Sequence, residues 1–81
     1  MDSLAQEYLI DVKGIECPQP VNVVAKELSK MPVGTQFRIV TDNYVCYMML
    51  QRLLKMLGER VDSTAEHEDA EEYEIIATRL M

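Results

Sequence analysis

The spacing of apolar residues along the chain predicts alternating strands and helices. Residues 7–12 predict a strand, with Tyr8, Ile10 and Val12 on one of its faces. In residues 18–31 the apolar positions recur every three or four residues, as on a helix with one buried face. The residues that this period places on the buried face are Val21, Val24, Ala25, Leu28 and Met31.

The same reading continues into the middle of the chain. Residues 35–41 predict a second strand. Asp42 or Asn43 can cap a second helix that runs to Leu57, with Gly58 in the left-handed position that often follows a helix. The predicted inward face of this helix comprises Cys46, Met49, Leu50, Leu53 and Leu57.

Two further strands complete the predicted fold. Residues 60–66 form a weak strand, expected at a sheet edge, and residues 73–80 a stronger one, with an acidic hairpin loop at 67–71. The order is βαβαββ, in which right-handed crossovers place both helices on one face of the sheet. We therefore expect a two-layer α/β (α+β) sandwich with a four-stranded sheet, built by residues 1–81 as a single domain.

Composition and net charge narrow the range of possible functions. The net charge of −6 argues against a nucleic-acid-binding protein, because phosphate binding relies on clustered Lys and Arg. This acidity suits a partner with a basic face, or it only keeps a small domain in solution. Two cysteines are too few for a disulfide scaffold, so the cytoplasm is the expected compartment. Residues 1–10 offer only a short apolar stretch, so neither a signal peptide nor a membrane span is expected.

The candidate chemistry lies in the consecutive residues Cys17, Pro18, Gln19 and Pro20. Proline is tolerated at the first position of a helix, so Pro18 is predicted to begin the helix and Cys17 to be its N-cap. The N–H of Gln19 would then point at the sulfur, and the helix dipole would favour a thiolate. Pro20 occupies the position of the second cysteine in a Cys-x-x-Cys motif, which excludes local dithiol cycling. A thiolate that holds one group remains: a persulfide, a mixed disulfide, an acyl group or a metal.

Other residues have simpler interpretations. Cys46 is predicted to be a small buried side chain, although both helices begin at the same sheet edge and a resolving or relay role stays open. Tyr47, Met48 and Leu54 could form an exposed apolar rim for a partner, or scattered surface residues. Because Cys17, Cys46 and His67 lack metal-ligand spacing, no metal site and no cofactor are expected.

Residues 10–20 resemble the signature of the TusA/SirA-like sulfur-carrier family: apolar-Asp-apolar-basic-Gly-apolar-x-Cys-Pro-x-Pro. The resemblance implies a mixed sheet with an antiparallel last strand. It also implies sulfurtransferase-type carrier chemistry, in which Cys17 accepts sulfane sulfur as a persulfide and relays it for tRNA thiolation, cofactor biosynthesis or sulfur metabolism. The supporting residues that it implies are Asp11, Gly14, Pro18, Gln19 and Pro20, with Lys26 as a basic contact residue.

The implied partners are a sulfur-donor protein, either a cysteine desulfurase or a rhodanese-like protein, and a sulfur-acceptor protein, with the chain itself a monomer. Two alternatives stay open. One is a non-catalytic docking or regulatory module of the same fold. The other is a thiol redox protein that uses Cys17 and Cys46, which requires the two sulfurs to lie within bonding reach.

Overall fold

The computed structural model describes residues 8–81, so Glu7 of the predicted first strand lies outside the described residues. The elements follow the predicted order βαβαββ, with a short 3₁₀ helix, η2, in the last hairpin. Their bounds are β1 Tyr8–Asp11, α1 Gln19–Lys30, β2 Gln36–Thr41, α2 Tyr44–Met56, β3 Arg60–His67, η2 Glu68–Ala70 and β4 Glu72–Thr78.

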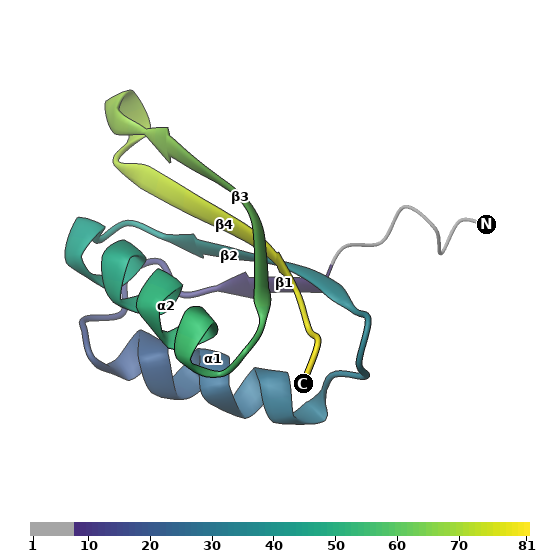
Figure 1. Cartoon of the computed structure of the whole chain (residues 1–81). Coiled ribbons are helices and arrows are strands. Elements are labelled where there is room, and N and C mark those ends of the chain that lie inside the picture. The colour runs from purple at the N-terminus through teal and green to yellow at the C-terminus, as the bar shows by residue number, and fades with distance from the viewer. Residues whose placement is uncertain (1–7) are drawn as a thin grey trace.

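The four strands form one mixed sheet in the order β1-β2-β4-β3. β1 runs parallel to β2, with Ile10 opposite Ile39, whereas β4 is antiparallel to both of its neighbours. Both helices cover the same face of the sheet, and β3 lies at its edge (Figure 1). The predicted two-layer sandwich, the mixed sheet and the edge position of β3 are confirmed.

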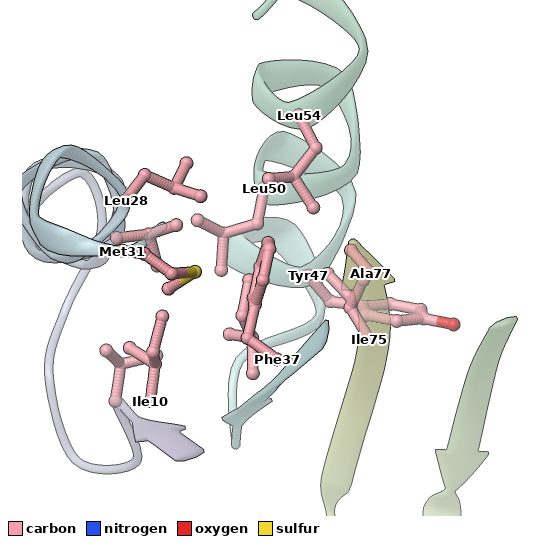
Figure 2. Packing of buried hydrophobic residues seen from close by; sticks show 12 residues of the cluster. Ile10, Leu28, Met31, Phe37, Tyr47, Leu50, Leu54, Ile75 and Ala77 are labelled. Atoms are coloured by element: carbon pink, nitrogen blue, oxygen red, sulfur yellow. The ribbon is translucent and has the colours of Figure 1, made fainter. Parts of the chain in front are cut away.

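The hydrophobic core lies between the helices and the sheet. Leu28 and Met31 approach from the α1 side and Leu50 from α2, above Phe37 and Ile10 of the sheet (Figure 2). Each of these side chains is at most 4% exposed. Close packing at this level holds both helices at fixed positions over the strands, and therefore fixes where their N-termini lie.

The first helix begins one residue later than predicted. Pro18 is its N-cap, Gln19 is its first residue, and Pro20 is buried in the first turn; the Cys17–Pro18 peptide bond is cis. The buried stripe is Pro20, Val24 and Leu28, so the prediction that Ala25 faces inward is wrong. Because the buried ring of Pro20 belongs to this stripe, the buried face of α1 is centred on Pro20, Val24 and Leu28. Ala25 lies to one side of this face and is exposed.

The second helix is rotated relative to the prediction. Tyr47 and Leu54 are 2% and 0% exposed, whereas Met49 and Leu57 are 40% and 41% exposed. The ring of Tyr47 stacks on Tyr73 of β4, with ring centroids 5.2 Å apart. Burying this large ring at the sheet turns α2, and Leu54 moves inward with it because it lies two turns further along the same side.

A polar cluster at the β3 edge gives one pH-dependent feature. The carboxylate of Asp62 accepts hydrogen bonds from the Thr78 hydroxyl at 2.6 Å, from Arg60 Nε at 2.6 Å and from Gln36 Nε2 at 3.3 Å. The Thr78 bond has the largest effect and lowers the pKa of Asp62 below its usual value. Burial, the second-largest effect, opposes this shift, and the bonds from Arg60 and Gln36 add to the lowering.

Replacing this carboxylate should remove a pH-dependent part of the stability. A depressed pKa stabilises the folded state above the unfolded pKa of about 3.9, and this contribution is lost as the pH falls through the folded pKa. Urea unfolding from pH 7 down to pH 3 should therefore show wild type more stable than Asp62→Asn at neutral pH, with the difference shrinking in acid. A difference that stays constant over this range would contradict the assignment.

No helix in residues 8–81 is long and apolar enough to cross a lipid bilayer.

Candidate functional site at the sheet edge

The loops that follow the parallel strands β1 and β2 meet at the end of the sheet where both strands finish, here called the sheet edge. The N–H of Gly14 donates to the carboxylate of Asp42 at 3.1 Å, which ties the first loop to the second. Within the first loop, Asp11 accepts the N–H of Lys13 at 3.0 Å. Gly14 has φ +81°, a conformation that glycine adopts without strain. Asp11, Gly14 and Asp42 together hold the approach to Cys17 against the start of α2.

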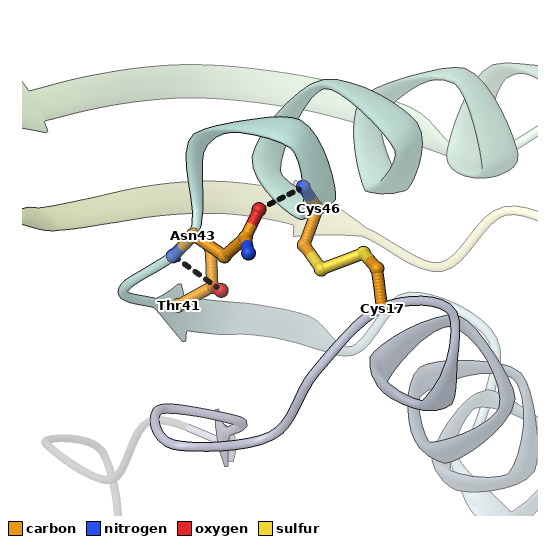
Figure 3. The surroundings of a disulfide bond; sticks show 4 residues. All are labelled: Cys17, Thr41, Asn43 and Cys46. Atoms are coloured by element: carbon orange, nitrogen blue, oxygen red, sulfur yellow. Dashed lines mark hydrogen bonds between the residues drawn. A yellow bond between two sulfur atoms is a disulfide. The ribbon is translucent and has the colours of Figure 1, made fainter.

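The first turn of α2 is fixed by a side-chain cap. The Asn43 side-chain oxygen accepts the N–H of Cys46 at 3.0 Å, and the Asn43 N–H donates to the Thr41 hydroxyl at 3.2 Å (Figure 3). Thr41 is fully buried, so the cap is anchored in the end of β2. The predicted capping of this helix is confirmed, with Asn43 rather than Asp42 as the N-cap. Cys46 therefore occupies a defined position in the first turn.

Cys17 and Cys46 form a disulfide across this edge (Figure 3). Their Cα atoms are 5.7 Å apart, within the usual range for a disulfide, although the residues are 29 positions apart in sequence. Cys46 is 0% exposed and Cys17 is half-buried. Solvent and other proteins therefore reach this bond from the Cys17 side.

This pairing changes the interpretation of the Cys-Pro-Gln-Pro segment. Pro20 does remove the nearby second cysteine, but the prediction of a thiol without a partner is wrong, because Cys46 supplies the partner from α2. The physical reason is the parallel pairing of β1 with β2, which brings the helices that follow them to begin at the same sheet edge. The structural requirement of the thiol redox alternative, two sulfurs within bonding reach, is met.

The mouth of α1 also differs from the prediction. Because Pro18 is the N-cap, Cys17 lies one residue before the N-cap instead of capping the helix itself. The Gln19 N–H donates to the carbonyl of Glu16 at 3.0 Å, so it does not point at the sulfur as predicted. Cys46, by contrast, lies within the first turn of its own helix, at the positive end of the dipole of α2.

The remaining predicted site residues lie in different environments. Pro18 and Gln19 are exposed beside Cys17. Lys26 is exposed on α1, two turns or roughly 10 Å beyond the helix start. Tyr47 is buried, so its assignment to an exposed partner-binding rim is wrong, whereas Met48 is 48% exposed. Leu54, the third residue of that predicted rim, is also buried.

Sequence reasoning missed two features of this region. The first is Asp42: its sequence position indicates only a helix cap, but its carboxylate accepts the Gly14 N–H. The second is a cluster of Tyr44, Tyr47 and Tyr73, whose ring centroids are 5.2–5.8 Å apart. The spacing of Tyr44 and Tyr47 by three residues on a helix signals that they are neighbours, but nothing local indicates the contact with β4.

The described part of the chain, residues 8–81, has no group of three or more His, Cys, Asp or Glu side chains that could hold a metal ion.

Comparisons with known proteins agree with the predicted fold and the predicted family. A family model described as Sulfurtransferase TusA matches residues 8–79. A crystal structure of a SirA-like protein from Desulfitobacterium hafniense superposes with a TM-score of 0.78 at 24% sequence identity. The match covers 91% of this chain and 99% of that one, and it shows a shared fold. A search of curated proteins finds no match to this chain.

Proposed function

Because the chain belongs to the TusA sulfurtransferase family, we propose that it is a sulfur carrier that holds sulfane sulfur as a persulfide on Cys17. The observation that carries this proposal is the unequal exposure of the two sulfur-bearing residues. Cys17 is half-buried and Cys46 is 0% exposed, so a macromolecular donor reaches Cys17 first. The accessible residue is also the one that the Cys-Pro-x-Pro segment contains.

Loading and delivery are two thiol exchange steps. The Cys17 thiolate attacks the outer sulfur of a donor's persulfide, a new S–S bond forms, and the donor's cysteine leaves as a thiolate. An acceptor's thiolate then attacks the outer sulfur on Cys17, and Cys17 leaves as a thiolate. The donor is a cysteine desulfurase or a rhodanese-like protein. The acceptor serves tRNA thiolation, cofactor biosynthesis or sulfur metabolism.

The disulfide form holds no free thiol, so the bond to Cys46 must be reduced before Cys17 can be loaded. A reducing compartment such as the cytoplasm supplies the thiols for this step. Lys26 and Met48, both exposed, are the residues proposed to contact partners of the monomeric carrier.

A second function is favoured by the disulfide itself. In a thiol redox protein an external thiolate would attack the accessible sulfur of Cys17 and the buried sulfur of Cys46 would leave. This function uses the same two residues but transfers only electrons, with no sulfur retained on the protein.

Sulfur loading separates the carrier from the redox protein and from a docking module. Reduced Cys46→Ala protein, which retains Cys17 and leaves no unpaired hydroxyl in the buried site, should gain one sulfur from a low-molecular-weight persulfide. Intact-mass spectrometry should map the gain to Cys17 and show its reversal by reductant. Reduced Cys17→Ser protein, the matched control, should gain none. Equal mass gains in the two variants after treatment would refute the carrier function.

A further inference from the structure

We propose that Cys46 is a resolving thiol: it releases the sulfur held on Cys17 as sulfide and closes the Cys17–Cys46 disulfide. This activity rests on the proposed persulfide at Cys17 and adds a second fate for the sulfur. Delivery transfers sulfane sulfur to another protein, whereas resolution reduces it within this chain.

The reach of Cys46 follows from the backbone. With 5.7 Å between the Cα atoms, the two sulfurs bond in the folded arrangement of the loops. The reacting atom of a Cys17 persulfide is its inner sulfur, which is the same Cys17 Sγ that bonds to Cys46 here. No rearrangement of the fold is needed for the attack, so the reaction has the high effective concentration of an intramolecular step.

Neighbouring groups hold this geometry from both sides. Asp42 binds the Gly14 N–H and ties the Cys17 loop to the start of α2, at 3.1 Å. Asn43 caps the N–H of Cys46, and Thr41 anchors Asn43 from the end of β2. None of these contacts involves the two sulfurs, so they keep Cys46 in place when the disulfide is open.

The step balances without another oxidant. The Cys46 thiolate attacks Cys17 Sγ, the Cys46–Cys17 S–S bond forms, and the bond from Cys17 Sγ to the outer sulfur breaks. The electron pair of that bond leaves with the outer sulfur as hydrosulfide. The sulfane sulfur is reduced by two electrons and the two cysteines are oxidised by two. A dithiol reductant, which reaches the pair at the half-buried Cys17, restores both thiols.

Delivery to an acceptor and resolution by Cys46 differ in the side from which the persulfide is attacked. Cys46 is fully buried and approaches the inner sulfur from the protein side. An acceptor approaches from solvent and attacks the outer sulfur. A bound acceptor therefore competes with resolution, and sulfur that is not collected leaves as sulfide.

A single-turnover experiment tests this activity. Reduced protein freed of reductant is mixed with one equivalent of cysteine persulfide and quenched with monobromobimane, and sulfide and intact mass are then measured. Wild type should release one sulfide per chain and end two hydrogens lighter than the reduced protein. Cys46→Ala should keep the added sulfur and release at least tenfold less sulfide. Cys46→Ser, which preserves the size of the side chain, should behave as Cys46→Ala does.

The outcomes distinguish the two proposals. If wild type retains the added sulfur as long as Cys46→Ala and Cys46→Ser do, Cys46 does not resolve the persulfide and only this inference fails. If neither Cys46 variant takes up sulfur, the persulfide itself is absent, and both the proposed function and this inference fail.

Discussion

Opening the Cys17–Cys46 disulfide should lower the free energy of unfolding by about 3–4 kcal/mol. The bond closes a loop between residues 29 positions apart, and in the chain-entropy model a loop of this size constrains the unfolded chain by that amount. For an 81-residue domain with a total stability of roughly 4–12 kcal/mol, this is a large fraction. The oxidised protein should therefore be much the more stable form.

Urea unfolding of the oxidised and reduced wild type measures this difference. Cys17→Ser is the matched control, because it opens the disulfide at its half-buried end and leaves Cys46 in the core. Its unfolding midpoint should equal that of the reduced wild type and should not respond to reductant. Identical midpoints for oxidised and reduced wild type would show that the bond does not constrain the unfolded chain.

Leu54→Ala should destabilise the protein by about 3–5 kcal/mol, whereas Leu57→Ala should cost less than about 1 kcal/mol. Leu54 is 0% exposed in the core between α2 and the sheet, and Leu57 is 41% exposed at the C-terminal end of the helix. The two substitutions remove the same atoms three residues apart in the sequence. Only burial distinguishes them.

This pair tests the rotation of α2, because the sequence pattern alone places Leu57 inward and Leu54 on the exposed rim. Chemical denaturation of both variants under oxidising conditions keeps the disulfide contribution constant. A larger loss for Leu57→Ala than for Leu54→Ala would mean that α2 presents the face that the sequence predicts, and the stacking of Tyr47 on Tyr73 would have to be wrong as well.

The disulfide and the rotation of α2 both bear on whether Cys46 can reach Cys17. Cys46 lies in the first turn of the helix whose buried face includes Leu50 and Leu54. The packing that fixes this face also fixes the distance from Cys46 to Cys17. Core variants of α2 should therefore slow disulfide closure as well as lower stability.

Local signals in the sequence were sufficient for the order of elements and the class of fold. The apolar periods predict each strand and helix, and the right-handed crossover predicts both helices on one face. The end of α2 is also predictable from local sequence, because a glycine commonly follows a helix in the left-handed conformation. Gly58 has this conformation, with φ +81°. The motif around Cys17 also identified the candidate site, because cysteine is not among the residues that usually precede a helix.

Tertiary structure decided two features that local sequence patterns leave ambiguous: the buried face of α2 and the partner of Cys17. The sequence of α2 offers two apolar stripes that share Cys46 and Leu50, and the contact of Tyr47 with Tyr73 on a distant strand selects one of them. The partner of Cys17 was likewise beyond local reasoning, since Pro20 excludes only a nearby thiol. The sequence by itself determined that a cysteine stands before the first helix. The parallel pairing of β1 with β2 brought Cys46 to it, because such pairing sets both helix starts at one edge of the sheet.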